Sequence, residues 1–560
     1  MVKKIFRLIE REISGLHEAA YLLGFFALLS QALGFLRDRL LASNFGAGEA
    51  LDIYYAAFRV PDLIFIWSAS MVSLSVLIPF LSKRREAGTA IARDFLDSVF
   101  SAFFAFIVVV SAVAFIFAPA LSSLFFPGFE EEARSITAHL MRIMLLQPIL
   151  LGISNLFASI TQLERRFFVY AISPILYNLG IVIGVFFFYP AFGLSGLAFG
   201  VVLGAFLHLG IQIPAIARAK LMPRPRFTID VGVVQEVFIT SLPRTAALSL
   251  QNITVLLLTA LGSLLGVGSI AVFNLSWNLQ SVPLAIVGAS YSIAAFPTLA
   301  GLWTRGERSV FIATLSTAMR HILFWSMPSL VLFVVLRAQI VRTVLGSGAF
   351  DWGDTRLTAA SLALFAASVV AQSISLLFTR GYYAAGKSRT PLGVAFLSAL
   401  VTLCSAFFFS RLFTGAPIAR YFLESLLRVS DLEGTFMLTL PLSYSVGAIV
   451  SAVAFWALYT RDFGRFESGV IGTFWQSFAA SIIMGFFSYV LLNAFSAVFN
   501  LHTTLGIFFQ GFFSGLGGLT IGALVLYLLG NVEIREIWKT LHHKIWKAKF
   551  VGPDPTETTF

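Results

Sequence analysis

The chain has few charged residues and only one cysteine. Charged residues make up 12% of its 560 positions, whereas soluble domains carry about 25%. A soluble core could not bury so large an apolar excess, so this composition excludes an ordinary soluble fold and makes lipid the main solvent. Cys404 has no second cysteine with which to form an intramolecular disulfide, and the sequence holds no cysteine–histidine cluster for zinc.

Signals for catalysis and for nucleic acid are also scarce. The seven histidines form no H-E-x-x-H pattern, and no acid or base stands beside an evident nucleophile. We therefore expect that the chain is not an enzyme and that it binds no metal and no cofactor. The net charge of +11 could indicate nucleic acid, but the lysines and arginines lie mostly in short loops between apolar runs. That pattern is typical of membrane orientation, so no nucleic-acid partner is expected.

Long apolar runs fill most of the chain, with a mean hydropathy of +0.87. Their lengths predict an all-α polytopic membrane protein with about fourteen transmembrane helices. Cations concentrate in alternate loops and at both ends, which places both termini in the cytoplasm and residues 43–48 outside. We expect a cytoplasmic segment over 1–15, an N-lobe of helices 1–6 over 16–220, a C-lobe of helices 7–12 over 230–462, helices 13–14 over 468–529 and a basic cytoplasmic tail over 530–560.

Two pairs of similar segments, each pair separated by nearly the same number of residues, indicate an internal repeat. Pro61 corresponds to Pro283, and Pro174 corresponds to Pro391, with similar residues around each pair. The spacing predicts two parallel six-helix repeats followed by two further helices. Transporters built in this way bind their substrate between the halves. Chance similarity between apolar segments is the alternative explanation.

Ionisable residues interrupt several of the predicted spans, where they are costly and usually functional. We expect Arg37, Arg59 and Arg244 to line a cavity, because a guanidinium binds phosphate oxygens bidentately. Arg142 and the acids Asp38 and Asp52 are expected to have structural or gating roles. Bridging ion pairs and arginines that reach the membrane interface are the alternatives.

Adjacent residues on a helix point about 100° apart. From this angle we expect Asp38 to bond a neighbouring helix while Arg37 turns separately to the cavity.

The stretch LGFLRDRLLASNFGAGEALDIYYAAFRVPD, which begins at Leu33, resembles the first two helices of the MurJ/MviN family of lipid II flippases. These belong to the multidrug/oligosaccharidyl-lipid/polysaccharide exporter superfamily. SPILYNLGIVIG at Ser173–Gly184 and LLFTRGYYAAGKSRTPL at Leu376–Leu392 add to the resemblance. Arg37, Asp38 and Asp52 match acidic and basic positions of the family motif. Asn278 stands where the family usually has an arginine, and we include it among the substrate-binding candidates.

The resemblance implies a flippase that moves a polyprenyl-pyrophosphate-linked peptidoglycan precursor, lipid II, from the inner to the outer leaflet by alternating access. It implies a cationic central cavity, a lipid-tail groove at the last two helices, and coupling to membrane potential or an ion gradient rather than ATP. The implied location is the bacterial cytoplasmic (inner) membrane, and the implied partners are lipid II or a similar polyprenyl-linked lipid, membrane lipids and cell-wall synthesis proteins. An exporter of another lipid-linked oligosaccharide or amphipathic drug, a membrane-embedded transferase and a non-transporting scaffold of envelope synthesis remain alternatives.

Overall fold

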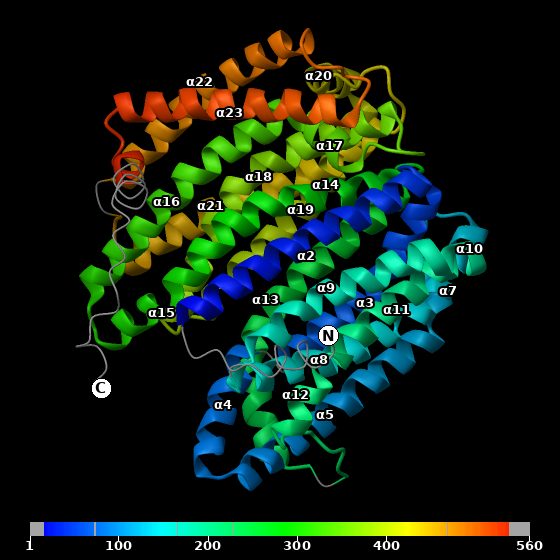
Figure 1. Cartoon of the computed structure of the whole chain (residues 1–560), viewed down its shortest axis with the longest axis vertical. Coiled ribbons are helices and arrows are strands. Elements are labelled where there is room, and N and C mark those ends of the chain that lie inside the picture. The colour runs from blue at the N-terminus through cyan, green and yellow to red at the C-terminus, as the bar shows by residue number, and fades with distance from the viewer. Residues whose placement is uncertain (1–15, 72–73, 165, 228, 467–468, 537–560) are drawn as a thin grey trace, which may run out of the picture. The chain divides into compact units, whose positions relative to one another are not determined.

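The computed structural model describes residues 16–71, 74–164, 166–227, 229–466 and 469–536 (Figure 1). All regular elements in these ranges are helices, and no strand occurs among them. The predicted all-α class is therefore confirmed. The N-terminal segment that the sequence predicts to be cytoplasmic and most of the predicted basic tail lie outside the described residues.

Twelve of the described helical segments are long and apolar enough to cross a membrane. Two further long helices, α2 (Leu16–Phe45) and α3 (Glu49–Met71), carry the charged positions singled out in the sequence. Together they are consistent with the predicted number of about fourteen.

The helices follow one another with short connections. The first half contains α2, α3, α4 (Leu74–Ala87), α5 (Thr89–Ile116), α6 (Ala118–Phe125), α7 (Glu131–Met144), α8 (Leu146–Leu163), α9 (Phe167–Ile183), η1 (Gly184–Phe188), α10 (Tyr189–Phe192), α11 (Leu194–Gly210) and α12 (Ile213–Arg218). The second half contains α13 (Val231–Ser263), α14 (Ser269–Pro283), η2 (Leu284–Ala289), α15 (Ser290–Thr304), α16 (Arg308–Val335), α17 (Arg337–Leu345), α18 (Trp352–Ala384), α19 (Arg389–Gly415), α20 (Pro417–Leu427), η3 (Thr435–Leu438) and α21 (Thr439–Phe463). The last two are α22 (Val470–Ser496) and α23 (Thr504–Leu528).

The described residues pack as two compact units. The first unit holds the chain up to Leu279 together with Val341–Phe365 and Lys387–Ser451. The second unit holds Gln280–Ile340, Ala366–Gly386 and the chain from Ala452 onward. This grouping follows packing rather than the internal repeat. It does not test the lobe boundaries, which stay a prediction.

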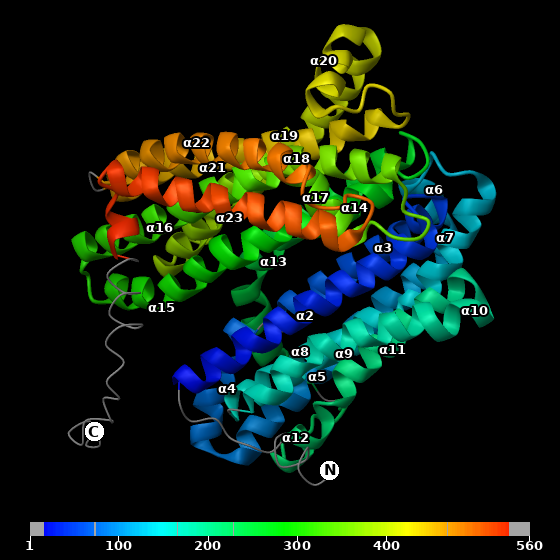
Figure 2. The same cartoon turned by 45° about the horizontal axis from the view of Figure 1, so that its top comes forward.

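Small residues set the closest helix contacts of the first unit. A Cβ placed on Gly180 of α9 would lie 2.3 Å from the Cα of Gly204 in α11, and one on Gly184 would lie 2.6 Å from the Cα of Gly200. Both separations are below any real contact, so the two helices depend on these glycines to lie side by side (Figure 2). Membrane helices, which gain little hydrophobic drive from each other in lipid, commonly pack in this way.

The second unit contains the pair α22 and α23, which lie along each other, with α16 packed on α22 (Figure 1). A Cβ on Gly518 would lie 1.8 Å from Ser488 Oγ across the α22–α23 contact. A charged pair in this unit lies just beyond the end of α23. Arg320 Nε lies 3.1 Å from Glu533 Oε1, and Thr473 Oγ1 donates to the same carboxylate.

One short stretch, Gly381–Ser388, matches the G-x-x-x-x-G-K-[ST] pattern of phosphate-binding loops. Such a loop needs a preceding strand and a following helix whose free N–H groups surround the phosphate. Here Gly381 lies inside α18, the amide of Ala385 donates to the Gly381 carbonyl, and Gly386 ends the helix with a φ of 71°. The match therefore marks the C-terminal cap of a helix and not a nucleotide site.

Candidate functional site

Arg37 and Asp38 of α2 form a direct ion pair. Arg37 Nε and Nη2 donate to Asp38 Oδ1 over 2.9 and 2.8 Å. The side chains are 22% and 4% exposed, so the pair is shielded from solvent. The expectation that adjacent helix positions keep these side chains apart is wrong, because the long arginine side chain turns back along the helix to reach its neighbour.

Two asparagines from other helices complete this group. Asn278 of α14 donates to Asp38 Oδ2 over 3.0 Å, as expected for an aspartate that bonds a neighbouring helix. Arg37 Nη1 donates to Asn178 Oδ1 of α9 over 3.0 Å. Among the described residues, three of the five N–H groups of Arg37 are thus engaged, and two remain for another acceptor.

Asn178 is a site residue that the sequence reasoning did not single out. It lies within Ser173–Gly184, a stretch noted for its family resemblance, so a signal was present. Nothing in the sequence showed that it meets Arg37, because the two are 141 positions apart.

Arg59 of α3 makes the second contact with α14. Its Nη2 donates to Asn274 Oδ1, and Asn274 lies one turn before Asn278 on the same helix face. Arg59 Nε is buried and has no hydrogen-bond partner within the described structure. A buried guanidinium N–H without a partner is costly, so it is a natural donor to a bound anion.

Asp52 joins α3 to the beginning of α14. Its two carboxylate oxygens accept hydrogen bonds from the backbone amides of Gly268 and Ala271 over 2.6 and 2.7 Å. These amides are among the groups that a helix start leaves without intrahelical partners. The carboxylate is 2% exposed, so Asp52 acts as a buried cap between two segments far apart in sequence.

Further contacts of the backbone join the 43–48 segment to distant segments at the same end of the first unit. The amide of Ala349 donates to the Ser43 carbonyl over 2.8 Å, and the amide of Ala47 donates to Asp354 Oδ2 over 3.0 Å. Gly348 and Gly268 have positive φ, and a Cβ on either would lie about 2.1–2.2 Å from a carbonyl oxygen of the 43–48 segment. We call this the 43–48 junction, formed by residues 43–48, 264–271 and 346–354.

The remaining predicted charges lie elsewhere in the first unit. Arg142, in the last turn of α7, is half-buried; its Nε donates to the Phe115 carbonyl over 3.1 Å and its guanidinium lies over the Phe115 ring. Its contacts are those of a peripheral helix bridge. Arg244 is half-buried on α13, and its membership of one cavity with Arg37 and Arg59 stays a prediction.

These features define a multi-pass α-helical membrane protein with a buried polar site between its helices, the class to which solute and lipid transporters belong. Comparison with known proteins identifies the family within this class. The model of the family described as "Lipid II flippase MurJ" matches residues 41–510, so the chain belongs to the MurJ family.

Curated relatives agree with this placement. The chain is 24% identical over 496 residues to a protein of Buchnera aphidicola named probable lipid II flippase MurJ, covering 84% of this chain and 96% of that one. It is 24% identical to the lipid II flippase MurJ of Burkholderia cenocepacia, covering 69% and 76% of the two chains.

Solved structures share the fold. A lipid II flippase MurJ in an inward closed conformation superposes with a TM-score of 0.73 at 20% identity, over 92% of this chain and all of that one. An inward-facing multidrug resistance transporter of the MATE family gives a TM-score of 0.61 at 16% identity, over 77% and 94%. At these identities the likeness concerns the fold alone.

Proposed function

We propose that this chain is a flippase that moves lipid II, a polyprenyl-pyrophosphate-linked peptidoglycan precursor, across the membrane by alternating access. Membership of the MurJ family supports this proposal, as do the names of the relatives in Buchnera and Burkholderia. The observation that carries it here is a pair of half-buried arginines: among the described residues, two N–H groups of Arg37 and the buried Nε of Arg59 remain for an anion. The family is one of transporters, and we propose no catalytic step.

In this mechanism, pyrophosphate oxygens accept hydrogen bonds from Arg37 and Arg59. Asp38 keeps the Arg37 guanidinium in place, while Asn278 and Asn178 hold the pair to α14 and α9. A fixed planar guanidinium offers paired donors to phosphate oxygens, which a lysine ammonium does not. The negative charge of Asp38 partly offsets Arg37, so binding stays weak enough for release.

The 43–48 junction supplies the other requirement of alternating access, a closure that can open. Its bonds are few and consist mainly of backbone amides donating to Asp52, Asp354 and the Ser43 carbonyl. Water could replace each of them when the segments separate. We propose that separation of these segments releases the head group.

We propose that the 43–48 junction faces the outside of the bacterial inner membrane and that both termini are cytoplasmic. The alternating cations of the loops support this orientation. Membrane potential or an ion gradient is the proposed source of energy. Cell-wall synthesis proteins are the proposed protein partners.

The orientation is tested by thiol labelling in a Cys404→Ala background. Val267 is 72% exposed at the 43–48 junction, so Val267→Cys should react with an impermeant thiol reagent in intact cells. Labelling only after the cells are opened would reverse the proposed orientation.

The site is tested by complementation in cells depleted of the native protein. Arg37→Ala should abolish growth at normal membrane abundance, and Arg37→Lys should be clearly impaired because the planar fork is lost. Asp38→Asn should be milder, since an amide oxygen can still accept one hydrogen bond. Arg305, a 62% exposed loop arginine, provides the matched control, and Arg305→Ala should grow normally.

Leaflet-specific labelling of lipid II in the same cells separates transport from an indirect role. Arg37→Ala cells should accumulate lipid II in the inner leaflet. Full growth of that variant at normal abundance would remove Arg37 from the mechanism and favour the scaffold alternative.

A further inference from the structure

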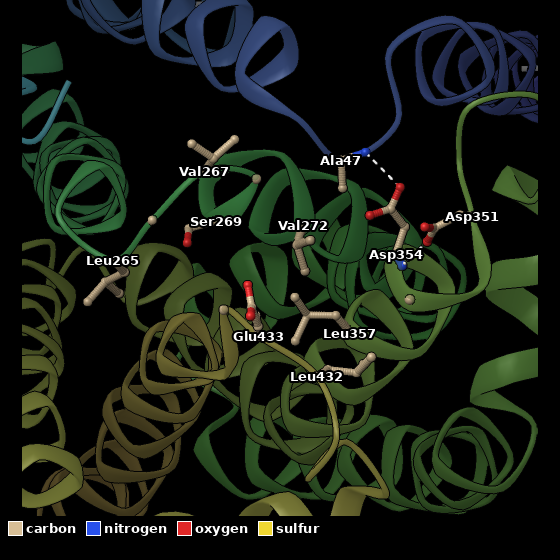
Figure 3. A pocket seen from close by; sticks show the side chains of 14 residues that line it. Ala47, Leu265, Val267, Ser269, Val272, Asp351, Asp354, Leu357, Leu432 and Glu433 are labelled. Atoms are coloured by element: carbon tan, nitrogen blue, oxygen red, sulfur yellow. Dashed lines mark hydrogen bonds between the residues drawn. The ribbon is translucent and has the colours of Figure 1, made fainter. Parts of the chain in front are cut away.

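A pocket of about 450 Å³ opens beside the 43–48 junction, entirely within the first unit. Its walls come from the 43–48 turn, the α13–α14 connection, the start of α18 and the loop before η3 (Figure 3). This volume is in the range of small-molecule sites. Arg37 and Arg59 are not among its lining residues, so it is separate from the site of the proposed transport function.

The charge of this pocket is opposite to that of the chain. Asp351, Asp354 and Glu433 line it, and its described lining includes no lysine, arginine or histidine, although the chain carries a net charge of +11. Two of these acids have structural bonds: Asp351 Oδ1 accepts from the Asp354 amide, and Asp354 Oδ2 accepts from the Ala47 amide. Each keeps a second oxygen, and Glu433 is exposed at the rim.

An independent feature points to a ligand. Ser269 lines the pocket, is 2% exposed, and its Oγ has no hydrogen-bond partner within the described structure. Figure 3 shows this hydroxyl and the Glu433 carboxylate entering the pocket from different segments. A buried hydroxyl without a partner costs free energy unless something occupies the space beside it.

The remaining walls are leucine, valine and alanine side chains and the backbone of four glycines. A metal ion is a poor match, because no three acidic, histidine or cysteine groups among the described residues are arranged to hold one. A cationic group on an apolar stem fits better. The carboxylates and the serine oxygen accept from its N–H groups, and the aliphatic walls cover its methylenes.

We infer that this pocket binds a primary alkylammonium group, such as a lysine-like amine of a peptide, on the side of the membrane that the 43–48 junction faces. Glu433 supplies the main charge, and Ser269 accepts one hydrogen bond deeper in the pocket. Binding here does not require transport, so the inference stands or falls separately from the function proposed for Arg37.

The test is calorimetric titration of the full chain in lipid nanodiscs. The probe is Nα-acetyl-lysine methylamide, and its Nε-acetylated form serves as an uncharged probe of similar shape. We expect saturable binding of the charged probe at least about tenfold tighter than that of the neutral one, because a charge-assisted contact is worth roughly a factor of ten or more. Equal affinities, or no binding of the charged probe, would overturn the inference.

Substitutions locate the binding. Glu433→Gln should weaken the charged probe about tenfold, and Ser269→Ala should weaken it several-fold. Glu130→Gln is the matched control, an exposed acid outside the pocket lining, and it should leave binding unchanged. Unchanged binding in Glu433→Gln would also refute the assignment.

Two further measurements distinguish this site from the transport site and from a metal site. Arg37→Ala should bind the probe normally, so loss of transport and loss of this site are distinguishable. Calcium chloride should not compete at constant ionic strength. Competition by calcium that disappears in Glu433→Gln would assign a metal site instead and overturn the ammonium assignment.

Discussion

The 43–48 junction of the first unit and the α22–α23 pair of the second unit are held together by different kinds of contact. In the junction, carboxylates and carbonyls accept hydrogen bonds from backbone amides of distant segments, as Asp52 does from Gly268 and Ala271. In α22 and α23, glycine and serine let the helices approach closely, as Gly518 does against Ser488. The first arrangement is directional, and the second depends on shape.

The difference matches what each region would do in a transporter. Hydrogen bonds between segments can exchange with water, so a junction built from them can exist in a closed and an open form. The van der Waals attraction at a close glycine contact falls off steeply as the helices separate, and water does not replace it. We infer that the junction is the part built to open and the helix pair is the part built to stay together.

The largest expected effect comes from removing the directional cap. Asp52→Ala leaves the amides of Gly268 and Ala271 without their acceptor in a buried place. Each unsatisfied group costs about 1–3 kcal/mol, so the variant should lose roughly 2–6 kcal/mol of stability. Thermal unfolding of the purified protein measures this loss, and Asp52→Asn should fall in between because its amide oxygen accepts one bond.

Glu49 provides the matched control for that experiment. It lies in the same first turn of α3 and is exposed, so Glu49→Ala should leave the melting temperature nearly unchanged. Similar melting temperatures for the Asp52 and Glu49 variants would show that the junction does not depend on this cap.

A smaller loss is expected from disturbing the shape-dependent contact. Gly518→Ala would place a Cβ 1.8 Å from Ser488 Oγ and 3.0 Å from the Met484 carbonyl oxygen. Overpacking of this kind costs about 1–3 kcal/mol, more than the roughly 0.5–1 kcal/mol that alanine gains over glycine in a helix. The variant should therefore melt at a lower temperature than the wild type.

Gly472 of α22 has open space around the corresponding position, so Gly472→Ala should melt at the wild-type temperature or slightly above it. If both alanine variants raised the melting temperature, close packing would not be what holds α22 to α23.

The fold class and the charged site residues could be predicted from the sequence, but most of the contacts between those residues could not. Hydropathy and loop charge predict the helical class and about fourteen spans, because both signals are local. Arg37, Asp38 and Asn278 were identified and do lie together, but the roles of Asn178 and Asn274 were missed. Their partners are 141 and 215 positions away, and no local pattern encodes such a meeting.

The error on Arg37 and Asp38 has a different origin. Helix geometry fixes where each side chain leaves the backbone, about 100° apart for neighbours. It does not fix where a flexible arginine ends, and the buried surroundings favour contact with the nearest carboxylate. The sequence also could not predict the unpartnered Ser269 hydroxyl. Its burial and the pocket beside it depend on four segments that are separate in the sequence and meet only in the fold.

The smallest effect is expected at the edge of the junction, where a directional contact is exposed. Arg356 donates through both terminal nitrogens to Asp431 over 2.6 and 2.5 Å, and these hydrogen bonds hold the pKa of the Asp431 carboxyl below its usual range. A lowered pKa stabilises the folded state above the ordinary carboxyl pKa of about 3.9, and that contribution disappears as the pH falls through the folded-state value. Asp431→Asn should therefore lower the melting temperature slightly at pH 7, less so at high salt because the pair is exposed. The difference from wild type should shrink as the pH falls below about 3.9 and vanish once Asp431 is protonated in the folded state. A difference that does not shrink with falling pH would show that Asp431 acts through packing rather than charge.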